Sequence, residues 1–311
     1  MYSRFKALQE FGETELKQLQ NSKVAVIGLG ATGSAIAEHL ARHGVDLVLF
    51  DRDYLEENDV YSSNIYTPEE CEKSLPKAVA AENYLEKFTE VESFNESLNP
   101  ETVEKLEDVD LMVDGTDNME TRFLLNEFSK KTDTPWIYTS AIAEKGYSMF
   151  LDSKCFNCVF EQVSPGALDT CESAGILRET STTAASISAE KAVKYLTDKP
   201  PKETLDTTDG QSFEIESHGC EVCEYKNFDT LNSKKKVSSV CGENKFQIEK
   251  DFGEEAYESV KEAGNIIAEN EYLVRAKLDR REIVFFHSGR AIVEAEDRGH
   301  AESIISETIG V

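Results

Sequence analysis

The hydrophobic positions in the first half of the chain alternate between short apolar runs and stretches with helical periodicity. Apolar runs at residues 24–27 and 45–50 flank a helical pattern at 34–43. Further along the chain, a helical pattern at 120–131 follows the apolar run 111–113. Short strands that alternate with helices are typical of a parallel, doubly wound sheet. We therefore expect a Rossmann-like α/β fold in this part of the chain.

The same patterns predict further elements around this core. We expect a helix over residues 1–20 ahead of the first strand, and an irregular polar loop over 54–76. The remaining expected elements are a helix at 77–88, strands at 91–94 and 136–138, a short helix at 100–106, antiparallel strands at 147–151 and 213–215, and a covering helix at 186–196. The predicted sheet is thus mostly parallel with an antiparallel extension.

A stretch rich in serine and lysine, residues 232–239, has the composition of a linker. Beyond it, the patterns predict a strand at 245–249, a helix at 254–263, strands at 272–279 and 282–295, and a helix at 299–308. We therefore predict two domains, residues 1–231 and a small C-terminal α+β module at residues 240–311.

The net charge of the chain limits the kinds of molecule that it can bind. The chain has 33 Lys+Arg against 60 Asp+Glu, a net charge of −27, with the acids spread along its length. Such a surface disfavours binding to a nucleic-acid backbone at ordinary salt, so we expect no nucleic-acid partner. Two explanations stay open, a generally well-solvated surface or adaptation to a salty, halophilic cytosol. We favour the second, because strong screening suits so many carboxylates beside 40% hydrophobic residues.

Two absences in the sequence favour a cytoplasmic protein that does not contact membranes. No apolar run is long enough for a transmembrane helix, which needs about 18 residues or more. The N-terminal segment is acidic and amphipathic, and it lacks the apolar core of a signal peptide.

A GxGxxG motif follows the first expected strand. Gly28 permits a tight turn, Gly30 lets backbone amides approach a phosphate, and Gly33 lets the helix pack closely on the strand. The helix N-terminus adds partial positive charge where phosphates would lie. Asp51, at the end of the second strand, is placed to accept hydrogen bonds from a ribose, and Asp53 is a further candidate. The motif predicts nucleotide binding; a glycine turn that serves packing alone is the alternative.

A second polar turn, DGTDN at residues 114–118, follows another expected strand. The carboxyl ends of strands in an open parallel sheet are where ligands bind. A carboxylate in this turn can hold Mg²⁺ on a triphosphate. Alternatively, Asp117 or Asn118 caps the following helix. The residues alone leave these two interpretations equal.

Two CxxC pairs, Cys155 with Cys158 and Cys220 with Cys223, suggest a zinc site. Four thiolates complete a tetrahedral zinc shell, and the fold must bring the pairs together across roughly 60 residues. Redox dithiols and buried free thiols are the alternatives, while His218 is a minor candidate ligand. We favour a structural zinc ion, because protein ligands would fill all four positions. A disulfide framework does not fit seven cysteines without an export signal.

A further cysteine, Cys171, lies between the pairs in the polar stretch DTCESAGIL. A thiol in a polar loop can act as a nucleophile if its pKa is lowered. Composition alone favours an ordinary loop residue here. Cys71 and Cys241 carry no indication of a role.

These pieces, in this order, resemble the ThiF/MoeB/HesA family, relatives of the ubiquitin-activating enzymes, over roughly residues 1–225. YSR at residues 2–4 is similar to the family's N-terminal motif, which implies that Arg4 reaches the ATP of the partner subunit in a homodimer. LPKAVAA at 75–81 resembles the segment that places a lysine, here Lys77, near the phosphates. The acidic turn implies a role for Asp117 and Asn118 in binding Mg²⁺–ATP.

The resemblance extends to three further parts of the chain. YTSA at residues 138–141 is similar to the stretch beneath the path of a flexible C-terminal tail. CESAGIL at 171–177 is similar to the loop whose thiol, here Cys171, takes up persulfide or thioester. The CxxC pairs match the family's structural zinc site.

The family resemblance implies ATP-dependent adenylation. The substrate would be the C-terminal Gly-Gly of a small ubiquitin-like or sulfur-carrier β-grasp protein, and the cofactors would be ATP, Mg²⁺ and Zn²⁺. Arg4, Lys77 and Mg²⁺ would offset the triphosphate charge, while Asp51 would fix the ribose. Such transfer needs positioning and charge neutralisation more than covalent protein chemistry.

One loop departs from the family pattern of an asparagine followed closely by Arg-Gln. Here it reads EENDVYSSNIY, in which Asn58 or Asn64 keeps the asparagine role and no arginine follows; Arg52 and Arg122 are possible substitutes. A hydrogen bond to a charged group is worth roughly 1.5–3 kcal/mol. Its loss would slow adenylation by about one to two decades.

Two other functions therefore stay open. An NAD-dependent oxidoreductase would also use the glycine turn and Asp51. A catalytically weakened adaptor would bind a ubiquitin-like protein without its chemistry, and the missing arginine favours it.

Overall fold

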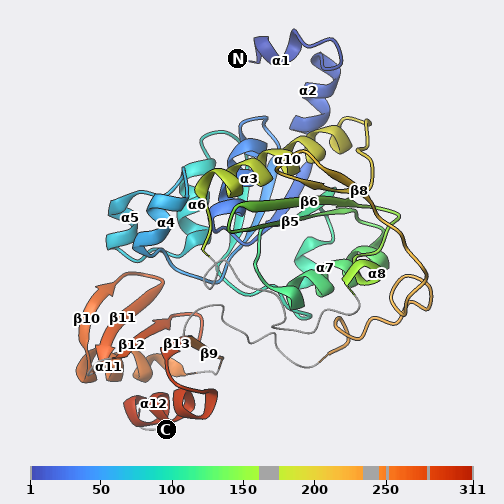
Figure 1. The fold of residues 1–311 in the computed structure, drawn as a ribbon. Helices are drawn as coiled ribbons and strands as arrows, with labels where there is room; N and C mark the ends of the chain where they lie inside the picture. Colours follow the sequence, from blue (N-terminus) through green and yellow to red (C-terminus); the bar gives the residue numbers. More distant parts are fainter. Residues whose placement is uncertain (1, 161–174, 234–244, 250–251, 279–280, 310–311) are drawn as a thin grey trace.

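The computed structural model describes residues 2–160, 175–233, 245–249, 252–278 and 281–309, and it contains two β-sheets with their own helices (Figure 1). The larger sheet has the strand order β3-β2-β1-β4-β5-β6-β7-β8. Its neighbouring parallel strands are β1 (Lys23–Ile27), β2 (Asp46–Phe50), β3 (Val91–Phe94), β4 (Leu111–Asp114) and β5 (Trp136–Ile142). The strand order reverses between β1 and β4, and ligands bind beyond the carboxyl ends of the strands at such a point.

The antiparallel extension consists of β6 (Lys145–Leu151), β7 (Thr204–Thr207) and β8 (Ser212–Glu214). The predicted fold class, a mostly parallel sheet with an antiparallel extension, is therefore confirmed. The expected strand at 213–215 belongs to a hairpin with β7, which the hydrophobic pattern did not indicate because all four β7 side chains are only half-buried.

Helices cover both faces of the larger sheet. One face packs against α3 (Ala31–Ala41), α6 (Lys77–Leu85) and α10 (Arg178–Leu196), and buried alanines let α3 and α10 approach each other closely. The other face packs against α7 (Met119–Thr132), the 3₁₀ helix Val103–Leu106 and α8 (Phe156–Phe160). Trp136 and Phe156 are fully buried in this second layer. The site residues that follow the strands are thus held on a rigid, two-sided core.

Several predicted boundaries were wrong. The expected helix over residues 1–20 is two helices, α1 (Ser3–Lys6) and α2 (Glu13–Gln20), and the Gly12 amide donates to Glu15 Oε2 at 2.8 Å at the start of the second. The expected loop over 54–76 contains α4 (Glu57–Ser62) and α5 (Pro68–Glu72). At the start of each helix a carboxylate accepts from the N-cap amide, Asp59 from Glu56 and Glu70 from Thr67, so side-chain hydrogen bonds define them where hydrophobic periodicity does not. Helix α10 begins at Arg178, not at residue 186, because its first turns bury hydroxyl side chains.

The C-terminal module contains an antiparallel sheet in the order β10-β11-β12-β13-β9. Its elements are β9 (Lys245–Glu249), α11 (Gly253–Ala263), β10 (Asn265–Glu269), β11 (Leu273–Leu278), β12 (Arg281–Phe286), β13 (Arg290–Glu294) and α12 (Arg298–Ile309). The predicted α+β character is confirmed. The single strand expected at 282–295 is wrong, because a turn with Gly289 at φ +88° divides it into β12 and β13.

Both faces of β12, the central strand of this smaller sheet, are buried. Ile283 and Phe285 of β12 pack in a cluster with α11 and α12, whereas Val284 and Phe286 pack against Tyr54, which follows β2. The C-terminal module therefore lies against the loops at the carboxyl end of the larger sheet (Figure 1). Among the described residues, no helix is both long and apolar enough to cross a membrane.

Candidate functional site

Three glycines bring two loops together at the carboxyl end of β1 and β4. Gly28 has φ +83°, and a Cβ atom there would lie 2.9 Å from Thr116 Cγ2. A Cβ atom on Gly33 would lie 1.8 Å from the Gly28 carbonyl oxygen, and one on Gly115 would lie 2.6 Å from Gly33 Cα. The glycine turn therefore packs backbone against backbone on the DGTDN turn, with no room for side chains.

Gly30 has different surroundings. It is the N-cap of α3, it offers no side-chain cap, and a Cβ atom there would meet nothing within 4 Å. The N-terminus of an α-helix binds anions through its backbone amides and its partial positive charge. The turn thus combines tight packing at Gly28 and Gly33 with open space at the position where a phosphate would approach.

Asp51 ties the end of β2 to this turn. Its Oδ2 accepts a hydrogen bond from the Leu29 amide at 2.6 Å, and its Oδ1 accepts one from the Asp53 amide at 2.7 Å. Burial, together with the nearby charge of Asp53, raises the pKa of Asp51 to about 6. Both acids predicted to lie near a ribose are therefore next to the glycine turn.

Lys77 lies among carboxylates at the start of α6. Its Nζ is 2.9 Å from Asp59 Oδ1, and its backbone amide donates to the Asp53 carbonyl at 2.8 Å. Burial alone would lower the pKa of Lys77, but the charges of Asp59, Asp51 and Asp53 outweigh it and raise the pKa. Lys77 therefore stays protonated beside the glycine turn.

Asp59 is a further residue of this site, and no motif in the sequence indicated it. It lies in α4, directly after Asn58, and its Oδ2 accepts a hydrogen bond from the Glu56 amide at 2.9 Å. Asn58 itself is exposed on the same short helix. The sequence did contain one signal for this role, the acid that directly follows Asn58. A buried lysine such as Lys77 needs a nearby carboxylate to remain charged.

The DGTDN turn divides its roles among its residues. Asn118 Oδ1 accepts hydrogen bonds from the amides of Glu120 and Thr121, so the cap of α7 is Asn118. Asp114 is fully buried and forms an ion pair with Arg122 at 2.9 Å. Asp117 is exposed at the same edge of the sheet. Asn118 is therefore the helix cap, and the interpretation as an ion-binding residue concerns Asp117.

The arginines that could replace the missing family arginine have different environments. The guanidinium of Arg122 is buried and binds Asp114, the carbonyl oxygen of Thr116 and, at 3.4 Å, that of Thr139. It is therefore committed to holding the DGTDN turn. Arg52 lies 3.9 Å from Asp53. Arg178, which no motif indicated, lies at the start of α10, and its guanidinium donates to the side chain of Asn64.

Arg4 is not brought to the glycine turn of its own chain. It belongs to α1, whose Phe5 ring lies 5.5 Å from the ring of His43, just beyond the C-terminal end of α3. The glycine turn is at the other end of α3, about 16 Å away for a helix of this length.

Cys171 lies in residues 161–174, outside the described part of the chain. The chain resumes at Gly175, whose carbonyl accepts a hydrogen bond from the Ala143 amide at 2.9 Å. Ile176 forms a parallel bridge with Ala143. The CESAGIL segment therefore ends beside the end of β5.

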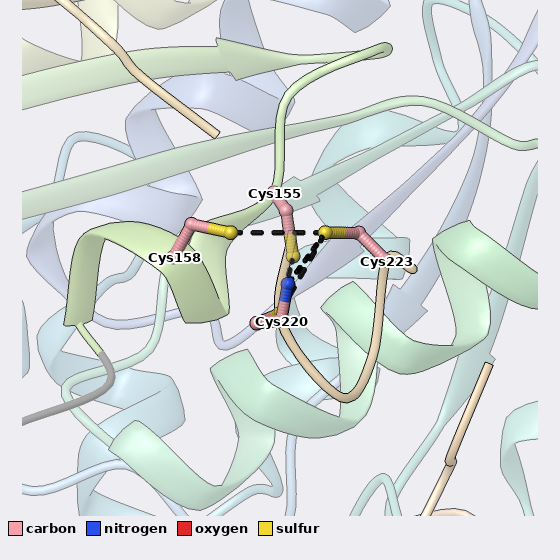
Figure 2. A group of neighbouring side chains, drawn as sticks. All are labelled: Cys155, Cys158, Cys220 and Cys223. Carbon is pink, nitrogen blue, oxygen red and sulfur yellow. Dashed lines mark hydrogen bonds between the residues drawn. The ribbon is translucent and has the colours of Figure 1, made fainter. Parts of the chain in front are cut away.

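Four cysteines form a compact cluster at the end of α8. Figure 2 shows the side chains of Cys155, Cys158, Cys220 and Cys223 pointing toward one another. Their sulfur atoms all lie within 4.8 Å, and three of the separations are 3.7–3.8 Å. Sulfurs bound at about 2.3 Å to a tetrahedral zinc ion would be about 3.8 Å apart. The donor set and spacing fit Zn²⁺, and His218 is not a member of the cluster.

A buried asparagine fixes this cluster to α7. Asn126 is fully buried, and its Nδ2 lies 3.3 Å from Cys155 Sγ while its Oδ1 accepts from the Phe156 amide at 3.0 Å. Cys155 also receives support through its own amide, which donates to Ser217 Oγ at 3.0 Å. Such partners orient metal ligands. Cys155 and Cys220 are buried, and Cys158 and Cys223 are half-buried.

Comparison with known sequences identifies the family. A sequence model of the ThiF family matches residues 2–232, well over half of the 311 residues. The chain belongs to the ThiF family. The resemblance inferred from the motifs is thereby confirmed, and it now covers the glycine turn, Lys77, the DGTDN turn and both CxxC pairs.

The ThiF-family chain is similar to several named proteins. It is 29% identical to the sulfur carrier protein ThiS adenylyltransferase of Bacillus subtilis, and the alignment covers 99% of both chains. It is also 29% identical to the SAMP-activating enzyme E1 of Haloferax volcanii, over 64% of this chain and 76% of that protein. The solved structure of E. coli MccB with ATP aligns with a TM-score of 0.55 and 16% identity, covering 68% of each chain, and shows the fold alone.

Two glycine substitutions separate packing from phosphate access. Gly33→Ala should destabilise the fold by about 1–3 kcal/mol or more, because its methyl group would overlap the backbone of Gly28. Gly30→Ala should change stability by about 0.5 kcal/mol or less but weaken ATP binding. Thermal unfolding and direct ATP titration measure both effects; equal losses of stability, or wild-type ATP affinity in Gly30→Ala, would contradict this interpretation.

The cysteine cluster predicts one zinc ion per chain. Structural zinc supplies roughly 10–16 kcal/mol of apparent binding energy, so Cys158→Ser should lose the metal and much of the thermal stability. Cys71→Ser is the matched control, because Cys71 lies outside the cluster and should retain both. Elemental analysis of protein purified without chelators checks the claim. Less than half a zinc ion per wild-type chain would argue against it.

Proposed function

We propose that this protein uses ATP to adenylate the C-terminal glycine of a small ubiquitin-like sulfur-carrier protein, and that a thiol or persulfide sulfur then attacks the activated glycine, with AMP as the leaving group. The observation that carries this proposal is the open glycine turn, with Lys77 and Asp117 at the same edge of the sheet. It is supported by the similarity, over the full length of the chain, to an adenylyltransferase that acts on ThiS.

The proposed reaction joins the carrier's terminal carboxylate to the α-phosphorus of ATP. A carboxylate oxygen forms a bond to that phosphorus, the bond to the β-phosphate bridge breaks, and pyrophosphate leaves with both bonding electrons. The amides at the start of α3 and the Lys77 ammonium bind the phosphates, and Asp117 is the residue that would hold Mg²⁺. Asp51 and Asp53 would accept hydrogen bonds from the ribose, with Asn58 and Asn118 lining the same edge. Such catalysis consists of positioning and charge stabilisation.

A homodimer would complete this site. Arg4 lies beyond the C-terminal end of α3, while the glycine turn of the same chain is at the opposite end. A guanidinium in that position serves a nucleotide only on another subunit. The proposal of an Arg4 that acts across an interface is supported by this separation.

Cys171 is the proposed acceptor in the second step. Adenylation itself needs no thiol, whereas in the second step the Cys171 thiolate attacks the acyl carbon, a thioester forms and AMP leaves. The persulfide alternative requires a sulfane-sulfur donor that loads the thiol first. The segment that follows Cys171 pairs with Ala143, at the end of β5 and hence on the edge that carries the nucleotide site. The four cluster cysteines are committed to zinc under the same proposal.

Several wider properties belong to the same proposal. We propose that the protein is cytoplasmic and has no membrane partner, because its sequence shows neither a long apolar run nor the apolar core of a signal peptide. Its net charge of −27 supports adaptation to high salt and the lack of a nucleic-acid partner. We also propose the division into two domains, residues 1–231 and 240–311.

Two substitutions should separate the chemical steps. Cys171→Ser should retain ATP–pyrophosphate exchange within a few-fold of wild type, yet lose any thiol-sensitive linkage to the carrier. Asp117→Ala should lose both, because it removes the proposed Mg²⁺ ligand. Exchange assays with candidate Gly-Gly carriers and non-reducing gels measure these outcomes. Abolished exchange in a folded, zinc-loaded Cys171→Ser protein would show that this assignment is wrong, and NAD binding without exchange would favour an oxidoreductase.

Mixing two inactive variants tests the shared site. Arg4→Ala and Asp117→Ala homodimers should each be impaired, but exchange of subunits creates hybrids in which one site has both residues intact. Up to about half of the hybrid sites should then regain activity, measured by pyrophosphate exchange after mixing. No recovery, with subunit exchange verified by a label, would refute the role of Arg4 across the interface.

A further inference from the structure

The C-terminal module contacts the larger sheet mainly at the loops that follow β2 and β3. Its polar contacts there join Tyr54 to Glu282, Lys245 to Glu56, Asn270 to the Lys73 carbonyl, Arg275 to Ser74, Arg290 to Asn95, and Gln247 to Ser97. These partners all lie between residues 54 and 97, at the edge of the sheet that carries the nucleotide site. The module is thus attached to the part of the fold that holds the candidate ribose and phosphate residues.

Tyr54 is the centre of this attachment. Its side chain is only 3% exposed, because it packs in one cluster with four apolar side chains of the module: Leu273, Val284, Phe286 and Ile292. Its hydroxyl donates to Glu282 Oε1 at 2.9 Å, with Glu56 Oε1 at 3.1 Å. The guanidinium of Arg275 lies 5.1 Å above its ring. A residue of the larger domain therefore fills the second face of the module's sheet.

The backbone on either side of Tyr54 leads directly to the site. Tyr54 forms an antiparallel bridge with Pro76, and the Leu55 amide donates to the Leu75 carbonyl at 2.8 Å. The Lys77 amide closes the pair by donating to the Asp53 carbonyl at 2.8 Å. We call these two segments, residues 53–55 and 75–77, the strap. Asp53 and Lys77 therefore lie opposite each other at the same end of the strap.

Arg275 supports this attachment from within the module. Arg275 binds Glu282 through two hydrogen bonds, at 2.7 and 3.0 Å, and donates to Ser74 Oγ at 3.2 Å. This arrangement orients the carboxylate that accepts from Tyr54. A bidentate arginine–carboxylate pair has a fixed geometry as well as a favourable energy.

The module also contributes positive charge at the strap. Burial would raise the pKa of Asp53, but Arg52, Lys77 and, from the module, Arg290 and Lys245 lower it. Arg290 is itself buried and stacks on the ring of Phe286 at 3.7 Å. Cations of the C-terminal module are therefore close enough to act on a carboxylate of the nucleotide site.

We propose that the C-terminal module is a positioning element of the nucleotide site, which holds the strap through Tyr54 and thereby sets the affinity for ATP. This inference rests on the proposed adenylation. Tyr54, Arg275 and Glu282 are positioning residues, because they act on nucleotide through Asp53 and Lys77. Small displacements at such a site are costly, since a shift of about 1 Å can reduce a rate 100-fold. The module accordingly acts on the binding of ATP.

Full-length variants test this role. Tyr54→Ala should raise the KM for ATP in pyrophosphate exchange, and the Kd of a non-hydrolysable ATP analogue, by at least ten-fold, with an unchanged KM for the carrier and full zinc content. Tyr54→Phe keeps the ring in its apolar cluster and should restore most of the affinity. Arg275→Met is a milder change and should raise the KM for ATP several-fold. It replaces Tyr54→Ala as the test variant if the Tyr54→Ala protein does not fold. Lys261→Ala is the matched control, because Lys261 pairs with Glu258 and Glu269 inside the module.

The outcomes separate this inference from the function on which it rests. If wild type binds the analogue and catalyses exchange while Tyr54→Ala and Arg275→Met match Lys261→Ala, the positioning role is wrong and adenylation stands. If these variants raise the KM for the carrier instead, the module recruits the carrier and the inference is likewise overturned. If wild type neither binds ATP nor catalyses exchange with any Gly-Gly carrier, the proposed function fails, and the inference with it.

Discussion

The site depends on a direct contact between two backbone turns. Gly33 lies so close to Gly28 that a single added carbon would fall 1.8 Å from a carbonyl oxygen, and Gly115 of the neighbouring turn lies against Gly33. This contact seats α3 on β1 and holds the DGTDN turn beside it. The N-terminus of α3 and the exposed carboxylate of Asp117 consequently share one edge of the sheet. Side chains at any of these three glycines would separate the two halves of the site.

Charge balance is the second constraint. Lys77 is surrounded by the carboxylates of Asp51, Asp53 and Asp59, so its own charge is more than compensated before any triphosphate arrives. An anionic substrate at this edge needs positive charge from other sources. The proposed function draws it from the α3 amides, a divalent metal and Arg4 of a second subunit, while cations of the C-terminal module offset the charge of Asp53. This need explains why a site in so acidic a chain would extend across two sheets and two subunits.

The sequence predicted those features that depend on local spacing. The GxGxxG turn, the strand–helix alternation and the two CxxC pairs each have a short-range signature, and the structure brings the four cysteines to separations that suit zinc. Helices α4 and α5 were missed because side-chain caps start them within a polar stretch. Asp59 was missed with α4. The role of Tyr54 was not predictable, since its burial depends on Glu282 and apolar partners more than 200 positions later.

The intact mass of a candidate Gly-Gly carrier tests the central claim most directly. After incubation with this protein, ATP and Mg²⁺, we expect the carrier to gain the mass of one AMP at its C-terminal glycine, with one pyrophosphate released for each carrier modified. A carrier that lacks the terminal glycine should remain unmodified. Release of phosphate or pyrophosphate without modification of any Gly-Gly carrier, in a zinc-loaded and dimeric preparation, would contradict the proposed adenylation.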